Sequence, residues 1–257
     1  MIDGDPSFAG IDQDQAAALA ARAQERGVVL RLIGGIAVAI HSPAAGHRTL
    51  KRDYADIDYI ARGASGRELD SLLAELDYQP DARFNGLHGK RRRLYFDQSG
   101  QRQVDIFVDS FEMCHQLPIG ERLSVDSPTV PLAELFLSKA QVVELNEKDM
   151  LDLLALLADH PVGEGDEETI NIDRITQLTG KDWGLWRTLI GSLEKIDASP
   201  ATTALEEPTR LLVGGRVNEI REAICASPKS VKWKARARVG DRVRWYELPE
   251  DPRRSVG

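Results

Sequence analysis

The 257-residue sequence predicts an α+β fold: a small mixed β-sheet with flanking helices, followed by a mainly helical C-terminal region that ends in a β-hairpin. Short β-branched and apolar runs predict the strands, because such runs are typical of strands with a buried face. Apolar residues at helical spacing lie between and after these runs, which predicts helices packed on the sheet.

The N-terminal part is expected to form a helix at residues 13–26, because Asp12 begins a capping-box pattern and the stretch after it is rich in alanine. The apolar run at 28–33 is predicted to be a buried strand. It ends at Gly34 and Gly35, which permit an abrupt turn into a short helix.

A loop at 42–54 leads to the next predicted strand, 56–60. A second capping box then begins a helix at 65–76, whose leucines recur at helical spacing and which we interpret as a crossover helix. The runs at 93–96 and 103–108 flank a stretch with turn-forming residues, so they are predicted to pair as a hairpin.

The remaining chain is expected to be helical up to its last element. The predicted helices lie at 131–157, with a continuation or kink near Asn146, and at 172–178, 183–196 and 209–224. Apolar and basic residues alternate from 231 to 246, which predicts a basic β-hairpin. We divide the chain into a catalytic domain at 1–115, a helical extension completing the site at 116–160, and an accessory region at 161–257.

Composition narrows the class of protein. With 42% hydrophobic and 29% charged residues, the chain can bury a core and is not of a disordered type. A net charge of -8 argues against a uniformly positive surface. Two cysteines form no disulfide framework, and neither a secretory signal nor an apolar run of roughly 18 residues is visible. We therefore expect a reduced, cytoplasmic protein without a membrane span.

Three aspartates are the candidate metal ligands. Asp56 and Asp58 flank Ile57 in one predicted strand, so their side chains share a face, and Asp105 lies within another apolar strand. A solvated surface role explains most Asp-x-Asp pairs. Aspartate is disfavoured inside strands, however, and three converging carboxylates need a compensating charge. Mg²⁺ or Mn²⁺ is the expected cation, because hard divalent ions prefer oxygen ligands.

The order of these motifs resembles the polymerase-β-type nucleotidyltransferase superfamily. The motifs are Leu32-Ile33-Gly34-Gly35, Asp56-Ile57-Asp58 and Val104-Asp105-Ile106. Within it the chain resembles the AbiEii-like toxin branch, which has an arginine-bearing loop after the glycine turn and a later helix with lysine and then aspartate. Here these features correspond to His41 and Arg48, and to Ser138-Lys139 and the segment 148–152. The resemblance spans residues 28–157.

The resemblance implies a nucleotidyltransferase fold and attack by an acceptor hydroxyl on the α-phosphate of a nucleoside triphosphate, with release of pyrophosphate. Asp56, Asp58 and Asp105 would hold the metal ions, and Asp105 would help to deprotonate the acceptor. The glycine turn, Gly34-Gly35, would bring backbone N–H groups to the phosphates. Asp149 belongs to the implied nucleotide-binding set.

One departure from the family pattern concerns the second glycine, where the family more often has serine. Gly35 has no hydroxyl for a phosphate, so Arg48 and Lys139 are the candidate phosphate contacts. Each has an ordinary alternative. Arg48, like His41, can be a solvated loop residue, and Lys139 can extend from an apolar helix face to water.

The sequence does not identify the molecule whose hydroxyl group accepts the nucleotide. The branch resemblance implies toxin-like modification of an RNA 3′ end such as that of tRNA, or of a protein hydroxyl, and an antitoxin partner. A small molecule, as with antibiotic-modifying relatives, is a third acceptor. Two other functions remain: a catalytically silent nucleic-acid-binding protein that uses the basic stretch 232–244, and a metal-dependent phosphohydrolase. The basic run at 90–93 is either a solvated strand entry or a phosphate contact.

Overall fold

The computed structural model describes residues 13–46, 49–54, 56–98 and 102–248. The strands are β1 (Leu30–Ile33), β2 (Ile57–Ala61), β3 (Gln79–Pro80), β4 (Arg92–Phe96), β5 (Gln103–Val108), β6 (Ser110–Glu112), β7 (Gln116–Pro118), β8 (Val162–Gly163) and β9 (Ile170–Asn171). The α-helices are α1 (Gln13–Glu25), α2 (Gly34–His41), α3 (Gly66–Glu75), α4 (Ala82–His88), α5 (Leu132–Ala140), α6 (Glu147–Asp159), α7 (Ile172–Thr179), α8 (Trp183–Ala198), α9 (Pro200–Thr203), α10 (Glu207–Ala226) and α11 (Val231–Ala237).

The central sheet is mixed and has the strand order β1-β2-β5-β4-β3. β2 and β5 pair in parallel, whereas β1 with β2, β5 with β4 and β4 with β3 pair antiparallel. β6 extends from β5 and pairs with β7. The predicted α+β fold with a small mixed sheet is confirmed, as is the hairpin of β4 and β5.

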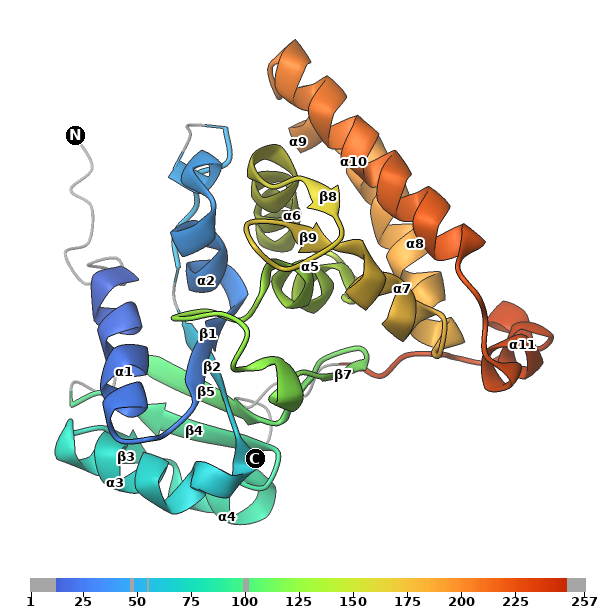
Figure 1. Ribbon diagram of the computed structural model, residues 1–257. Coiled ribbons are helices and arrows are strands. Elements are labelled where there is room, and N and C mark those ends of the chain that lie inside the picture. The colour runs from blue at the N-terminus through green and yellow to red at the C-terminus, as the bar shows by residue number, and fades with distance from the viewer. Residues whose placement is uncertain (1–12, 47–48, 55, 99–101, 249–257) are drawn as a thin grey trace, which may run out of the picture.

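The sheet lies on one side of the molecule and most of the later helices lie on the other (Figure 1). α2 begins directly at the end of β1 and packs against α5 and α6. Nearly all of α5 is buried, because it also contacts α7 and α8. One continuous apolar core therefore extends from α1 to α10. None of the helices in the described part of the chain is both long and apolar enough to cross a membrane.

The predicted helix at 131–157 is two helices. α5 ends at Ala140, and α6 begins after Asn146, whose side chain accepts a hydrogen bond from Asp149 N at 2.9 Å. That contact is a helix N-cap, so the chain restarts rather than kinks at this point. The break gives α5 and α6 separate directions, which positions their charged residues opposite one another.

Two short helices lie where no helix was expected. Asp81 caps α4 by accepting from Phe84 N at 2.9 Å. Ser199 caps α9, with Pro200 in its first turn, inside the predicted loop 198–208. Both helices have fewer than eight residues, so neither contains enough sequence to show helical periodicity.

The predicted C-terminal β-hairpin is wrong. Residues Val231–Ala237 form α11, and a short 3-10 turn follows at Gly240–Arg242. Ser230 caps the helix by accepting from Trp233 N at 3.1 Å. The alternation of apolar and basic residues covers too few positions to outweigh this cap, and lysine, alanine and arginine favour helix.

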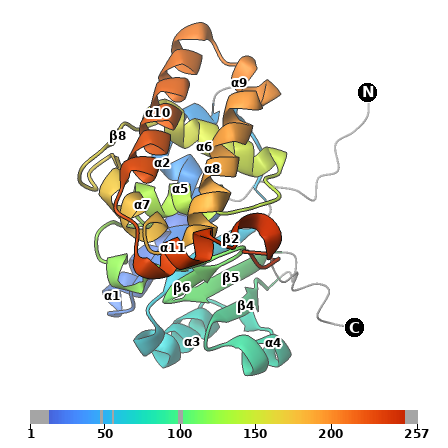
Figure 2. The same ribbon diagram turned by 90° about the vertical axis from the view of Figure 1, so that its right-hand side faces the viewer.

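α11 lies beside α8 (Figure 2). The tryptophans of the C-terminal segment pack against that helix: the ring centroid of Trp233 is 5.3 Å from that of Trp186, and the centroid of Trp245 is 5.9 Å from that of Trp183. Trp245 also donates from Nε1 to Thr188 Oγ1 at 3.0 Å. These rings anchor the segment, while the side chains of Lys232, Lys234 and Arg238 remain exposed.

Candidate functional site

Asp58 and Asp105 lie directly opposite each other on the parallel strands β2 and β5. Residues in register on neighbouring strands point to the same face, so the two carboxylates share one side of the sheet. Asp105 is buried, and both of its oxygens have partners: Oδ1 accepts from Arg92 Nε at 2.8 Å and Oδ2 from Gln103 Nε2 at 2.7 Å.

The ionised form of Asp58 is destabilised by its surroundings. Burial and then the charge of Asp105 raise its pKa to about 7, against the opposing influence of Lys139 and Arg92. Among the described residues its carboxylate accepts no hydrogen bond. A carboxylate removed from water beside a second one favours any cation that neutralises the pair.

Asp56 takes a different position from that expected. β2 begins at Ile57, so Asp56 precedes the strand and is exposed, although it still raises the pKa of Asp58. Within the described residues, the three aspartates do not bring one oxygen each to within 4.8 Å of one another. The structure thus shows a close Asp58–Asp105 pair with Asp56 at its margin.

Gly34 forms the turn between β1 and α2. Its φ of +79° lies in the left-handed region, which favours glycine. A Cβ at this position would lie 2.5 Å from Asp58 Oδ2. Glycine therefore permits both the turn and the close approach of the backbone to this carboxylate.

Gly35 is required for a different reason. A Cβ there would lie 1.8 Å from Arg52 Nη2 and 2.9 Å from a ring carbon of Tyr54. The Arg52 guanidinium lies 4.2 Å from the centre of the Tyr54 ring and bonds to both oxygens of Asp152, each at 2.7 Å. The superfamily that the sequence resembles more often has serine at the position of Gly35. In this protein the guanidinium of Arg52 fills the space that a serine side chain would need.

Lys139 joins α5 to α6. Its Nζ lies 2.9 Å from Asp149 Oδ1 and 2.8 Å from Asp152 Oδ2, and its side chain is 12% exposed. Burial alone would lower the pKa of Lys139, but Asp152 and Asp149 raise it above its ordinary value. Lysine therefore stays charged beside Asp58, whose pKa it lowers.

These groups face a cavity of about 290 Å³. The predicted residues that line it are Gly34, Asp58, Lys139 and Asp149. Asp105 and Gly35 adjoin it as the strand and turn neighbours of these residues. Its size is near the lower end of ligand pockets, about 300 Å³, and suits a phosphate group with its cation more than a whole nucleotide. Arg48, another predicted residue, lies outside the described residues.

The sequence interpretation missed the two arginines that hold the aspartates. Arg52 lies in the loop before β2, and Arg92 lies in the basic run 90–93, on the strand next to Asp105. A buried aspartate within a strand needs a partner, so a basic residue on the hairpin neighbour was the available signal for Arg92. The resemblance included Asp152 only within the segment 148–152. Its pairing with Arg52 has no local signal, because the two residues are 100 positions apart in the sequence.

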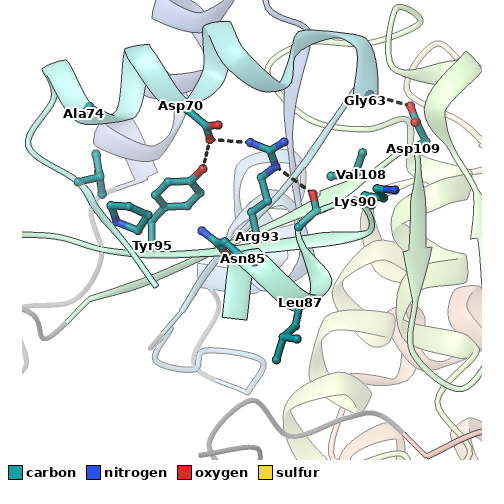
Figure 3. A pocket seen from close by; sticks show the side chains of 14 residues that line it. Gly63, Asp70, Ala74, Asn85, Leu87, Lys90, Arg93, Tyr95, Val108 and Asp109 are labelled. Carbon is teal, nitrogen blue, oxygen red and sulfur yellow. Dashed lines mark hydrogen bonds and ion pairs between the residues drawn. The ribbon is translucent and has the colours of Figure 1, made fainter. Parts of the chain in front are cut away.

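A larger hollow of about 1150 Å³ lies elsewhere, between α3, α4 and β4 (Figure 3). None of the predicted site residues lines it. Its arginine, Arg93, is already bonded to Asp70 at 2.6 Å and to backbone carbonyls, and Tyr95 also donates to Asp70. Its Arg93–Asp70–Tyr95 group is thus internally paired, and none of the glycine-turn or carboxylate residues lies there, so we place the candidate site at the smaller cavity.

A basic hollow adjoins the candidate site. The segment after α11 runs back towards β6, where Glu247 N donates to Cys114 O at 3.1 Å. Between them lies a hollow of about 700 Å³, in whose lining the arginines outnumber the carboxylates by one. The arginines are Arg91, Arg236 and Arg244, and the carboxylates are Glu112, which pairs with Arg91 at 3.3 Å, and Glu247. Cys114 also lines the candidate cavity, so the two spaces are neighbours that share a wall.

The fold and site define an α+β protein whose mixed sheet carries a carboxylate pair beside a glycine turn. No known protein family and no curated protein matches this sequence. Among solved structures, an antigenic nucleotidyltransferase-like protein from Paracoccidioides brasiliensis is similar, with 13% identity and a TM-score of 0.39 over 86% of this chain and 94% of that one. A STING-associated CdnE c-di-GMP synthase from Capnocytophaga granulosa gives 12% identity and a TM-score of 0.28 over 86% of this chain and 84% of that one.

Proposed function

We propose that this protein is a metal-dependent nucleotidyltransferase that transfers a nucleoside monophosphate from a nucleoside triphosphate to a hydroxyl acceptor. The observation that carries the proposal is the pairing of Asp58 with Asp105 across β2 and β5, beside the Gly34 turn and Lys139. Carboxylates, a close backbone turn and a cation around one small cavity are the parts that phosphoryl chemistry requires.

The carboxylate pair fits a divalent cation. Asp58 is partly buried with a raised pKa and no described hydrogen-bond donor, so it has the greatest need of a positive partner. Asp58 and Asp105 would hold Mg²⁺ or Mn²⁺, with Asp56 at the exposed side. When bound there, such an ion neutralises charge on the attacking and leaving oxygens.

The chain's own residues supply positioning. The first turn of α2 has no side-chain cap, so its N–H groups are available to phosphate oxygens where Gly34 opens the approach. Lys139, held by Asp149 and Asp152, adds a fixed positive charge to the same cavity. Arg92 and Gln103 orient Asp105, which is the candidate group to accept the proton of the attacking hydroxyl.

The test is transfer of label from each α-labelled ribonucleotide to RNA, protein or a panel of small hydroxyl compounds, with Mg²⁺ or Mn²⁺. Asp58→Asn should reduce transfer at least ~100-fold, because loss of a metal ligand costs no less than loss of a ligand's supporting partner. Asp70→Asn is the matched control in the unrelated hollow and should retain activity. Transfer that survives Asp58→Asn would overturn the proposal.

The acceptor we propose is an RNA end, in a toxin-like modification. The basic hollow next to the cavity supports a polyanionic acceptor, because arginines attract a phosphate backbone. The tRNA 3′ end is the first substrate to test, and coexpression with neighbouring open reading frames tests for an antitoxin. Label in protein or in a small molecule instead would reassign the acceptor and leave the chemistry in place.

A catalytically silent nucleic-acid-binding protein is the second candidate. It is favoured by Asp105, whose two oxygens already have protein partners. This function predicts RNA binding that is indifferent to Asp58→Asn and to chelators, with no label transferred under any condition. A phosphohydrolase would instead release free phosphate, which the same assay detects.

A further inference from the structure

A second cluster of ligand-type side chains lies at the opposite ends of the two helices that form the candidate site. One ring nitrogen of His41, one of His160 and a carboxylate oxygen of Glu168 lie within 4.8 Å of one another. In the described part of the chain this is the one group of three histidine, cysteine or acidic residues so placed. His41 ends α2, His160 follows α6 and Glu168 lies between β8 and β9.

Hydrogen bonds fix the ring of His160. Its Nε2 lies 3.1 Å from the carbonyl oxygen of His41, and a carbonyl only accepts, so Nε2 carries the proton. In a neutral ring Nδ1 is then an acceptor, and it faces Glu168 Oε2 at 3.5 Å. Two acceptors at this distance repel unless a proton or a metal ion lies between them.

The ring of His41 is held in a corresponding way. Its Nε2 contacts Thr129 Oγ1 and lies 3.4 Å from Asp126 Oδ2. The hydrogen bond is to the Thr129 hydroxyl, and Asp126 is an ion-pair neighbour of the same nitrogen. With Nε2 occupied in this way, Nδ1 is the nitrogen left for ligation. Metal-binding histidines characteristically hydrogen-bond through their other ring nitrogen, which His160 does to a carbonyl and His41 to a hydroxyl.

The surrounding field also favours a cation. The C-terminal ends of α2 and α6 meet here, and helix C-termini carry partial negative charge. Asp126 adds a carboxylate 3.4 Å from His41. Two arginines partly offset that field: Arg216 donates to Leu157 O and Ala158 O in the last turn of α6, and Arg31 donates to Asp126 O at 2.6 Å.

We propose that His41, His160 and Glu168 form a zinc site that fastens α2, α6 and the β8–β9 connection to one another. Two imidazole nitrogens and one carboxylate are a donor set that Zn²⁺ accepts, with water in the fourth position. Ligands about 2.1 Å from a tetrahedral ion lie roughly 3.4 Å apart. The His160–Glu168 separation of 3.5 Å already matches this, and a ring nitrogen of His41 lies within 4.8 Å of both ligand atoms.

The test uses the full-length protein stripped with EDTA and then titrated with Zn²⁺ by calorimetry, and with Co²⁺ by visible absorption of the tetrahedral ion. With excess Mg²⁺ present to occupy the carboxylate pair, we expect one equivalent of Zn²⁺ to bind at this site and the thermal midpoint to rise. Glu168→Gln should weaken Zn²⁺ binding at least ~10-fold. Because the Glu168 side chain is 74% exposed, this variant keeps the fold and the test stays decisive. His160→Gln should abolish the tetrahedral Co²⁺ spectrum.

Two controls locate the site. Glu167→Gln removes a neighbouring exposed carboxylate from the same loop and should bind Zn²⁺ as the wild type does. Asp58→Asn should also keep Zn²⁺ binding, which separates this site from the carboxylate pair and makes the result independent of transferase activity. Absence of Zn²⁺ binding, or equal binding by wild type and Glu168→Gln, would overturn the proposal.

Discussion

The ionised form of Asp58, which is proposed to hold a metal ion, lowers the stability of the metal-free protein. Burial and Asp105 raise its pKa to about 7, so the folded protein holds a proton there that the unfolded chain releases near pH 4. The contribution of this group to stability is therefore present at low pH and lost as the pH rises through 7. A carboxylate kept at this cost is consistent with a cation-binding role.

Asp58→Asn is therefore expected to stabilise the metal-free protein. The gain should grow between about pH 4 and pH 7 and level off above it at up to about 4 kcal/mol, because three pKa units correspond to that energy. Chemical denaturation of both proteins in EDTA, at pH values from 5 to 8, measures the difference. A stability difference between the two proteins that does not change with pH would contradict the raised pKa of Asp58.

Gly35 is expected to reject the serine that the resembling family has at this position. Gly35→Ser places a side chain against Arg52 and should lower the free energy of unfolding by about 1–3 kcal/mol, as overpacking does. Gly215→Ser in α10 is the control, because nothing lies within 4 Å of a Cβ there. Equal effects of the two substitutions would show that Arg52 moves aside without cost.

At the scale of elements, α5 and α6 are fastened by a charge network. Arg52, Lys139, Asp149 and Asp152 alternate in sign and are largely screened from water. The network links a loop to two helices and lies directly beside Asp58. It therefore holds the helical side of the candidate cavity against the sheet.

Asp152→Asn is expected to destabilise the protein by about 3–5 kcal/mol, since it leaves Arg52 and Lys139 short of a buried partner. Asp197→Asn, which breaks the exposed pair with Arg221, should cost no more than about 1 kcal/mol. Urea denaturation with both variants measures the contrast. Similar costs would mean that the buried network does not hold α5 and α6.

The helical state of residues 231–237 is testable at its cap. Ser230→Ala should cost about 1 kcal/mol because Trp233 N loses its acceptor, and Ser230→Asp should restore most of it. Thermal unfolding compares the variants. Equal stability of all three would favour the extended conformation that the alternating sequence suggested.

Element prediction succeeded where local pattern and burial agree. β5 was predicted with the limits it has, because Gln103–Val108 is a short β-branched run between turns. α11 was missed because period-2 and helical patterns cannot be separated over seven residues. The break between α5 and α6 depends on the Asn146 cap, which the apolar pattern does not reveal.

At the scale of the whole molecule, net charge and local charge differ in sign. The chain carries a net charge of -8, whereas Lys232, Lys234 and Arg238 are exposed on the same short segment as Arg236, which lines the basic hollow. The proposed RNA acceptor would therefore be held at one place rather than over the whole surface. The tryptophans there are packed on α8, so phosphate pairing rather than base stacking would dominate.

Replacing Lys232, Lys234 and Arg238 together by glutamine should weaken binding of single-stranded RNA. The slope of log K against log salt concentration should become shallower by about 0.7 for each phosphate that the protein no longer neutralises. Fluorescence anisotropy at several salt concentrations measures the slope. Nucleotide binding at the Asp58 cavity should be unchanged, and an unaltered slope would exclude this segment from the acceptor site.

The sequence by itself determined the α+β class, the glycine turn and the three candidate aspartates, because each depends on residues close together in the chain. The roles of the aspartates and the division into three domains remain predictions. Only the tertiary structure placed Asp105 opposite Asp58, set Arg52 against Gly35 and Asp152, and brought His41, His160 and Glu168 together. Many of these residues lie far apart in the sequence, and only packing of the core decides which distant side chains meet.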